Sequence, residues 1–354
     1  MNLVVVPGDG IGPEITDATM KAVRALEQRF GLKLSIQNLE SGLVSLKRHG
    51  VTLRDEDIEA ARRADGVILG PMSVAQYPAP EAGGINVSAR YRIALNLYAN
   101  VRPCYTRAGV PSMAKQMDLV FVRENLEDFY VDRNMYVGIG EFMPTPGIVL
   151  AVGKITAEGT RRAARVACEI ARRRPRKKLT IVHKAPVLKL YNGLFLSVAK
   201  EVAKDYPEIE VDDLLVDAVA ALLVRTPERF DVVLIPNMFG DILSDEASEL
   251  AGSLGLAGSL NHGDDCTVAQ AAHGSAPDIA GKDVANPSSL MLSTAMLFEY
   301  VGAKKRDEAL VKAAQRLQQS VDAILENPNT RTRDLGGALG TRAFAEAVVQ
   351  RILQ

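Results

Sequence analysis

The strongest constraint on the fold is a regular alternation of short apolar runs with longer segments whose apolar residues recur at helical spacing. Short runs rich in Val, Ile and Leu are typical of buried strands, whereas recurrence every three to four residues indicates helices. Strands are predicted at 3–6, 34–38, 66–69, 119–122, 179–182 and 232–235. Helices are predicted at 13–30, 53–63, 157–173 and 192–205, with two more closing the chain at 288–301 and 307–325. This order predicts α/β layers around a largely parallel sheet.

Size and composition narrow the class further. The chain has 354 residues, of which 47% are hydrophobic and 24% charged, which suits about two globular domains. Its net charge of -1 argues against nucleic-acid and membrane-surface partners. No signal peptide or bilayer-spanning run is present, so we expect a cytoplasmic protein. The three cysteines, Cys104, Cys168 and Cys266, have neither disulfide nor zinc spacing, and buried free thiols are predicted.

The segment 237–246 (NMFGDILSDE) carries the clearest chemical signal. It follows the apolar run 232–235 and opens a helical pattern, so Asp241 and Asp245 share one face of a helix. Two carboxylates at this spacing repel each other unless a divalent cation binds both. The alternative is a solvated acidic turn that favours the helix dipole.

Other polar residues follow predicted strands or lie on helices. Arg102 and Arg123 flank or follow apolar runs, Arg92 lies in the helical run 87–98, and Lys184 directly follows the strand 179–182. Arginines at element ends suit carboxylate binding, although each alone is also compatible with a surface role. The glycine-rich segment 7–14 (PGDGIGPE) lacks the G-x-G-x-x-G spacing of a dinucleotide fingerprint, but its glycines allow close approach of the backbone to a ligand. The irregular stretch 130–152 is predicted to form a hairpin-like arm.

Together these motifs resemble the β-decarboxylating dehydrogenases that act on isocitrate, 3-isopropylmalate, homoisocitrate, tartrate and malate. The resemblance extends along the chain through 7–14, 97–103 (LYANVRP), 122–130 (VRENLEDFY), 182–184 (VHK), 239–246, 252–256 and 273–282 (HGSAPDIAGK). It implies an isopropylmalate-dehydrogenase-like two-domain fold rather than a Rossmann fold. The implied larger domain is 1–96 plus 252–354 with NAD-binding loops, and the smaller is 97–251 with the dimer interface and a clasp arm at 130–152. Self-association as a homodimer or a dimer of dimers with shared sites is implied.

The resemblance also implies roles for individual residues. Asp241 and Asp245, with Asp217 of a second subunit, would hold Mg²⁺ or Mn²⁺. Lys184 of the second subunit would accept the hydroxyl proton, and Tyr130 would protonate the product carbon. Arg92, Arg102 and Arg123 would bind substrate carboxylate.

The cofactor is implied by the loop after 273–277. NAD enzymes of the family carry an aspartate there, whereas NADP enzymes carry Lys-Tyr. This chain has Asp278 and Ile279, and a carboxylate repels a 2′-phosphate, so NAD is expected. The implied cofactor-binding residues are Ile11, His273, Gly274, Ser275, Ala276, Asp278, Ile279, Ala285 and Asn286.

The substrate is set, in this family, on the helix ahead of Arg92. Isopropylmalate enzymes place paired leucines where this chain has Ser88 and Ala89, and isocitrate enzymes place serine and asparagine where it has Asn86 and Ser88. The pocket is thus closest to an isocitrate type, with isopropylmalate, homoisocitrate, tartrate and D-malate as alternatives. Asn86 could equally be a helix N-cap.

Three departures from the family pattern suggest a specialised paralogue: Pro186, Ala218 and Gln270 replace the usual asparagine, asparagine and glutamate. Oxidation without decarboxylation is a further alternative. A non-catalytic regulatory subunit is the rival from another class, and it predicts that a catalytic or metal-binding residue has been lost. Tyr130, Lys184, Asp217, Asp241 and Asp245 are all present.

Overall fold

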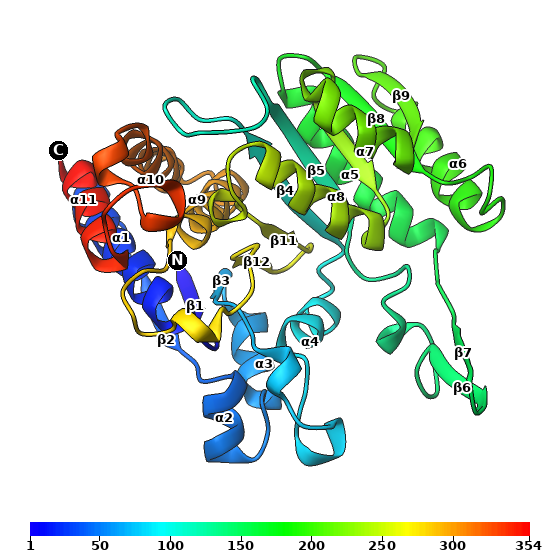
Figure 1. Ribbon diagram of the computed structural model, residues 1–354, viewed down its shortest axis with the longest axis horizontal. Coiled ribbons are helices and arrows are strands. Elements are labelled where there is room, and N and C mark those ends of the chain that lie inside the picture. The colour runs from blue at the N-terminus through cyan, green and yellow to red at the C-terminus, as the bar shows by residue number, and fades with distance from the viewer. The chain divides into compact units, whose positions relative to one another are not determined.

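The structure is a computed structural model that describes all 354 residues. The chain divides into two compact units. The terminal unit comprises Met1–Asn96, Thr106–Met113 and Gly252–Gln354, and the central unit comprises Leu97–Tyr105 and Ala114–Ala251. Each is an α/β assembly with its own strands and helices, as the ribbon in Figure 1 shows.

The strands of the terminal unit lie in the order β2-β1-β3-β12-β11. All neighbours in this order are parallel except β11 and β12, which are antiparallel. Strands β1 and β3 are almost wholly apolar, as is typical of parallel strands covered on both faces. Their bounds are β1 Asn2–Val6, β2 Ser35–Asn38, β3 Gly66–Leu69, β11 Leu260–His262 and β12 Thr267–Gln270.

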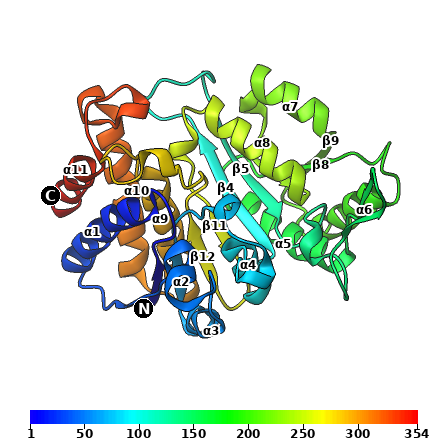
Figure 2. The ribbon, with the colours of Figure 1, turned by 60° about the horizontal axis from the view of Figure 1, so that its bottom comes forward.

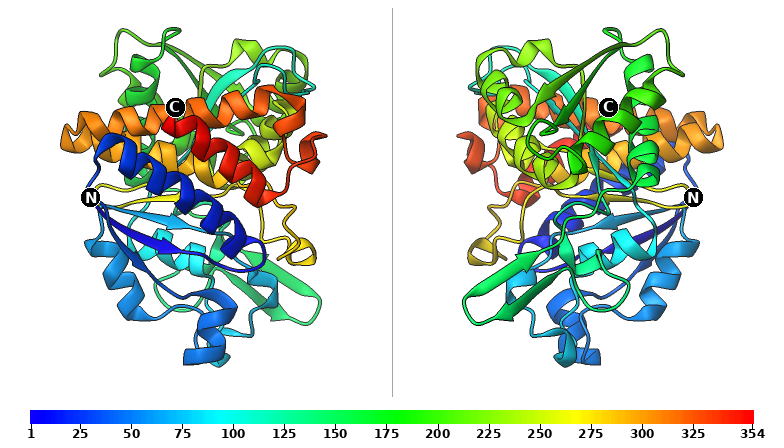
Figure 3. Two further views of the ribbon diagram at one scale, coloured as in Figure 1. Left: turned by 90° about the vertical axis from the view of Figure 1, so that its left-hand side faces the viewer. Right: turned by 90° about the vertical axis from the view of Figure 1, so that its right-hand side faces the viewer.

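Helices cover both faces of this sheet. Figure 3 shows α1 and α11 side by side on one face, with α9 beside them, and α2 and α3 on the other face. Helix α9 contacts β3 and β12 directly and is buried along most of its length, so it forms the centre of this unit's core. The helices are α1 Gly12–Phe30, α2 Gly42–His49, α3 Asp55–Arg63, α4 Val87–Ala94, α9 Ser288–Lys305, α10 Glu308–Glu326 and α11 Thr341–Leu353.

The central unit has the strand order β4-β5-β10-β8-β9, in which only the β4–β5 pair is antiparallel. Its strands are β4 Ala99–Tyr105, β5 Asp118–Glu124, β8 Lys178–His183, β9 Glu210–Leu215 and β10 Val232–Ile235. Its helices are α5 Ala157–Arg173, α6 Tyr191–Ala203, α7 Val216–Arg225 and α8 Asn237–Leu250.

Successive residues of β10 alternate between two cores. Val232 and Leu234 pack with α5 and α6, whereas Val233 and Ile235 pack with α7 and α8. The strand is therefore apolar throughout because both faces are covered. Figure 2 shows α8 running across β4 and β5 in this layer.

The stretch 130–152 forms an arm with one antiparallel hairpin, β6 (Glu141–Thr145) and β7 (Ile148–Ala151). Every residue of both strands is exposed, including Phe142, Met143 and Val149. The predicted hairpin is thus confirmed, and its apolar side chains lie uncovered in the single chain.

The predicted elements are present, with several additions. The sequence prediction missed helices α2, α7 and α11 and strands β4, β9, β11 and β12. It was wrong that two helices close the chain, because α11 follows them, and the run 87–98 ends as a helix at Ala94. All three cysteines are buried and free, as predicted. None of the helices combines the length and hydropathy that a bilayer-spanning segment requires.

Candidate active site and cofactor loops

One face of the β4–β5 pair carries three long polar side chains. Asn100 lies opposite Arg123 in the antiparallel register, and Arg102 lies two residues further along β4. Alternation therefore directs Asn100, Arg102 and Arg123 to the same face, which is the face covered by α8. Arg102 and Arg123 are 6% and 1% exposed, so both guanidinium groups need internal partners.

Helix α8 approaches this face closely because of a glycine. A Cβ at Gly240 would lie 2.8 Å from Arg123 Cγ and 2.8 Å from Ile235 Cγ2. The start of the helix is also fixed from outside, since Asp128 Oδ2 accepts the backbone N–H of Met238 at 2.7 Å. These constraints place the next turn of α8, with Asp241, directly over the arginines.

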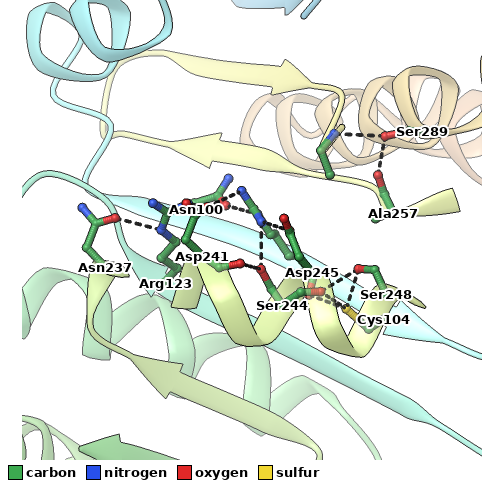
Figure 4. A network of polar contacts seen from close by, with 12 residues as sticks. Asn100, Cys104, Arg123, Asn237, Asp241, Ser244, Asp245, Ser248, Ala257 and Ser289 are labelled. Carbon is green, nitrogen blue, oxygen red and sulfur yellow. Dashed lines mark hydrogen bonds and ion pairs between the residues drawn. The ribbon is translucent and has the colours of Figure 1, made fainter. Parts of the chain in front are cut away.

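The arginines and the aspartates of α8 form one network. Arg102 donates from Nη1 to Asp245 Oδ1 and to Ser244 Oγ, each at 2.8 Å, and from Nη2 to Asp241 Oδ1 at 3.4 Å. Its Nε donates to Asn100 Oδ1 at 2.6 Å. In Figure 4, Asn100, Arg123, Asp241 and Asp245 converge from the strands and from α8. The predicted placement of the two aspartates on one helix face is confirmed, and both carboxylates contact a buried arginine while staying partly open to water.

Arg123 is held by two contacts and keeps one nitrogen unpaired. Its Nε donates to Asn237 Oδ1 at 2.8 Å, and its Nη1 donates to Asp241 Oδ1. Its Nη2 is buried and has no hydrogen-bond partner. A buried guanidinium nitrogen without an acceptor is costly in a folded protein, and an anionic ligand would supply the missing acceptor.

Tyr130 joins the same network. Its hydroxyl donates to Asp241 Oδ2 at 2.5 Å, and the guanidinium groups of Arg123 and Arg133 each lie 5.2 Å from its ring centre. Two cations over one phenol ring fix its orientation by cation–π attraction. The phenol is thus held beside the carboxylate that the arginines also contact.

Burial disfavours the charged forms of the groups in this network. Burial lowers the pKa of Arg102, and the neighbouring charge of Arg123 acts in the same direction. Burial raises the pKa of Asp245, and the nearby Asp241 adds to this. Two buried cations against two carboxylates half open to water leave room for a further anion or, between the carboxylates, a further cation.

The carboxylates suit a divalent metal but do not complete its coordination within one chain. Asp241 and Asp245 side chains are 41% and 46% exposed and offer the hard oxygen ligands that Mg²⁺ and Mn²⁺ prefer. No group of three potential ligand side chains occurs in the single chain. The residues present therefore fit a metal site that lacks one protein ligand.

Lys184 and Asp217 lie together elsewhere in the central unit. Lys184 Nζ donates to Asp217 Oδ1, and this hydrogen bond lowers the pKa of Asp217. The lysine directly follows β8, and its backbone N–H is held by Asn192 Oδ1 at 2.7 Å. The structure thus brings together the predicted base and the predicted third metal ligand as a pair of their own.

In the terminal unit, the glycine-rich segment packs against the loop 273–279. The backbone N–H of Ile11 donates to the carbonyl of Ser275 at 2.8 Å, and a Cβ at Gly10 would lie 2.0 Å from the same oxygen. Ser275 Oγ also accepts from Ser73 Oγ at 2.8 Å. These glycines let the protein's own backbone approach closely, and their approach to a ligand stays a prediction.

His273 presents a single unpaired acceptor in this loop. Its Nδ1 lies 2.9 Å from the carbonyl oxygen of Gly274, which can only accept, so Nδ1 carries the proton. Its Nε2 is buried and has no partner, and burial lowers the pKa of the ring, which favours the neutral form. A neutral imidazole nitrogen without a proton can accept one hydrogen bond.

The other predicted cofactor-binding residues differ in whether their side chains already make hydrogen bonds within the chain. Asp278 is exposed, makes no internal hydrogen bond or ion pair, and lies with Ile279 in a short 3-10 turn after Ala276, whose φ is +36°. Asn286, in contrast, donates to Asp334 Oδ2 at 2.9 Å and accepts from the N–H of Ser288, the first residue of α9. Ala285 is 2% exposed.

Helix α4 carries the predicted substrate-selecting residues. Asn86 is its N-cap, since Asn86 Oδ1 accepts from the N–H of Ala89 at 3.1 Å, so the capping alternative is confirmed. Ser88 and Arg92 are half-buried and four residues apart, on one face of the helix. Ser88 Oγ accepts from Gln270 Nε2 at 2.8 Å.

Comparison with known proteins identifies the family. Residues 2–348 match the family described as isocitrate/isopropylmalate dehydrogenase. The chain belongs to this family. It is 42% identical to the isocitrate/homoisocitrate dehydrogenase of Thermus thermophilus, over 99% of this chain and 98% of that protein. It is 39% identical to the 3-isopropylmalate dehydrogenase of Archaeoglobus fulgidus, over 98% of each. The solved structure of isocitrate dehydrogenase from Methylococcus capsulatus superposes with a TM-score of 0.88 at 38% identity, covering 100% of this chain and 99% of that chain.

As a member of the isocitrate/isopropylmalate dehydrogenase family, the chain is an oxidoreductase that decarboxylates hydroxyacids, with the family's two-domain fold. The family is generally dependent on NAD and a divalent metal, and its members act on small molecules and commonly form homodimers. The relatives carry different substrate names, so membership alone fixes the reaction class and not the substrate.

Some members of the network were not predicted from the sequence. Asn100, Asn237 and Ser244 orient the arginines, and Gln270 contacts Ser88. A signal existed for two of them: Asn100 lies two residues before Arg102, and Ser244 lies between the two aspartates.

Proposed function

We propose that this chain is an NAD-dependent, Mg²⁺- or Mn²⁺-dependent dehydrogenase that oxidises and decarboxylates a malate carrying a polar 3-substituent, with isocitrate or a close relative as substrate. The observation that carries the proposal is the convergence of Arg102, Arg123 and Tyr130 on the carboxylates of Asp241 and Asp245. One helix face thus gathers metal-type ligands, carboxylate-binding cations and a phenolic acid.

The metal site would be completed across a subunit boundary. Asp241 and Asp245 would bind the ion, and Asp217 of a second copy would supply the third carboxylate. A divalent cation held by these carboxylates would supply Lewis-acid chemistry for the substrate's C2 oxygen during oxidation and decarboxylation. The hydrogen bonds from Arg102 and Arg123 would hold the two carboxylates in place before the ion binds.

The chain's own groups would carry the protons and the charge. Lys184 Nζ would accept the proton of the C2 hydroxyl, and the Tyr130 hydroxyl would return a proton to C3 after decarboxylation. The unpaired Nη2 of Arg123 supports its role in binding a substrate carboxylate, together with Arg102 and Arg92. The Tyr130 hydroxyl already donates its proton to Asp241 in a hydrogen bond. This contact would keep the proton close to the proposed metal ligands, where C3 of the substrate would take it up.

NAD would supply the hydride acceptor for C2, and two features of the loop 273–279 support NAD as the cofactor. The buried Nε2 of His273 suits the adenine amine, and the exposed Asp278 suits ribose hydroxyls. Its charge disfavours a 2′-phosphate. Ile11, Gly274, Ser275, Ala276, Ile279, Ala285 and Asn286 complete the proposed lining.

The small and polar side chains of α4 support a substrate with a polar 3-substituent. Ser88 and Ala89 are too small to fill an apolar pocket, and Ser88 offers a hydroxyl on the same helix face as Arg92. Asn86 Oδ1 is used by the cap, so only its amide nitrogen would face a ligand. A malate with a carboxylate-bearing substituent is therefore preferred over 3-isopropylmalate, which needs apolar contacts.

Self-association supports the shared site. The arm exposes apolar side chains along both strands, and Tyr136, Val137 and Met143 are 105%, 81% and 62% exposed. An uncovered apolar hairpin in a folded protein marks an interaction surface. We expect it to pack against a second copy of the chain.

The test is NADH formation with Mn²⁺ or Mg²⁺ on isocitrate, homoisocitrate, 3-isopropylmalate, D-malate and tartrate, with CO₂ release measured in parallel. We expect the highest kcat/KM for isocitrate or homoisocitrate, with one CO₂ per NADH. Activity with none of these acids would contradict the proposal, as would a preference for NADP. NADH without CO₂ would favour simple oxidation instead.

A further inference from the structure

Gln270 forms a direct contact with the proposed substrate-selecting helix. It ends strand β12, and its Nε2 donates to Ser88 Oγ on α4 at 2.8 Å. Both residues are half-buried and both belong to the terminal unit. The main chain of Gln270 is fixed as well, since its N–H donates to Ser259 O at 3.1 Å and its carbonyl accepts from Ser293 Oγ at 2.9 Å.

The neighbours of Gln270 decide which end of its amide faces Ser88. Asn261 Nδ2 lies 3.4 Å from the backbone carbonyl of Val268 and 3.5 Å from Gln270 Oε1. A carbonyl oxygen can only accept, so Asn261 presents its NH₂ group to both. Gln270 must then present its oxygen to Asn261, which leaves its NH₂ group for Ser88.

The direction of that bond sets the chemistry of Ser88. A serine hydroxyl has one proton and can accept through its lone pairs. Because Gln270 donates, Ser88 uses a lone pair and keeps its own proton, and no acceptor in the chain takes that proton. A carboxylate at position 270 would reverse the direction of this hydrogen bond. An ionised carboxylate can only accept, so Ser88 would donate its proton to residue 270.

We propose that Gln270 is a positioning residue that makes Ser88 a hydrogen-bond donor toward an acidic 3-substituent of the substrate. The proposal rests on the proposed function, because it assigns Ser88 to the substituent. It adds that the amide at 270 selects a carboxylate-bearing substituent. A glutamate there would turn the same serine into a group that offers that substituent only lone pairs.

The experiment is a double-mutant cycle of Gln270→Glu and Ser88→Ala in the full-length enzyme. Isocitrate is compared with a reference substrate that has no acidic substituent, either malate or 3-isopropylmalate according to which is turned over. We expect Gln270→Glu to lower kcat/KM for isocitrate about tenfold to a hundredfold, mainly through KM, as for loss of a hydrogen bond to a charged group. The reference substrate should lose less than about threefold.

The Ser88→Ala background separates hydroxyl orientation from charge repulsion. If Gln270 acts through Ser88, adding Gln270→Glu to Ser88→Ala changes kcat/KM for isocitrate by less than about threefold. An equal loss in both backgrounds would overturn the proposal, because the new charge would then act without the serine. An equal loss on both substrates would overturn it as well.

Two further readouts keep the outcomes distinct. If Gln270→Glu does not fold, as judged by its thermal unfolding midpoint, Gln270→Met removes the donor without a charge, and a smaller selective loss that vanishes in Ser88→Ala is expected. No turnover of any hydroxyacid by the unmodified enzyme would refute the proposed function itself. Turnover that prefers 3-isopropylmalate to isocitrate would refute the assignment of Gln270 while leaving the reaction class intact.

Discussion

The most informative perturbation is Asp241→Asn, because this carboxylate joins more of the site than any other group. It accepts from Arg123, from Arg102 and from Tyr130, and the two arginines are 1% and 6% exposed. The substitution keeps the size of the side chain and removes its charge. Arg123 then loses its carboxylate partner, and Arg102 keeps only Asp245.

The expected loss can be worked from these contacts. Removing one partner of a fully buried ion pair costs about 3–5 kcal/mol. Asp241 is 41% exposed, and water screens the pair, so we expect a loss of about 2 kcal/mol in the free energy of unfolding. Asp245→Asn is the matched control, because Asp245 pairs only with Arg102 and is 46% exposed. Burial already raises the pKa of Asp245, and we expect its substitution to cost about 0–1 kcal/mol.

The assay is urea unfolding of the metal-free protein at neutral pH, followed by the shift in thermal midpoint on adding Mn²⁺. Metal-free, Asp241→Asn should be less stable than Asp245→Asn. Both variants should lose the stabilisation that Mn²⁺ gives the unmodified protein, since each lacks one proposed ligand. Equal stability of Asp241→Asn and the unmodified protein would refute the account of the buried arginines. Full stabilisation of either variant by Mn²⁺ would refute its role as a ligand.

Two other predictions test separate parts of the account. Asp278→Lys should lower kcat/KM for NAD and raise it for NADP, measured as initial rates with each cofactor; an unchanged ratio would remove Asp278 from the cofactor site. Glu124 is buried, and burial raises its pKa to about 7. A raised carboxyl pKa means stability that is full below the unfolded-state pKa and is lost as pH rises toward 7. Glu124→Gln should therefore flatten the fall in unfolding free energy between pH 4.5, the ordinary pKa of a glutamate, and about pH 7, and a pH profile parallel to that of the unmodified protein would contradict this.

The sequence predicted the parts of the site that depend on local spacing. Asp241 and Asp245 lie on one helix face because four residues make about one turn, and Arg123 is the second-last residue of β5 because the strand extends one residue beyond it. Strand β10 was found for the same reason. The resemblance to the family, in turn, rested on motifs that the comparison with known proteins confirmed.

The contacts that depend on register and tertiary packing could not be predicted. The pairing of Asn100 with Arg123 requires the antiparallel alignment of β4 with β5, and β4 was not predicted because it begins directly after the run 87–98, which was interpreted as helical. Gly240 gives no local sign that it brings α8 against Arg123. The capping role of Asn86 was an open alternative that only the geometry of Ala89 decided.

The exposed strands of the arm illustrate the remaining limit. Val149 and Phe142 are apolar residues that a single-chain pattern assigns to a core, yet both are exposed in the structure. We propose that a second copy of the chain covers them, and the same second copy would bring Asp217 and Lys184 to Asp241. A single chain therefore contains all the proposed groups without a complete site.

The most direct test of this shared site is complementation between two inactive variants. Tyr130→Phe and Lys184→Ala should each abolish isocitrate-dependent NADH formation when assayed alone. If each site takes Tyr130 from one subunit and Lys184 from the other, dissociating and reassembling an equal mixture should restore about a quarter of the normal rate, because half of the dimers are mixed and each has one intact site. No recovery, with mixed dimers shown to form by native mass spectrometry, would contradict a site built from two chains.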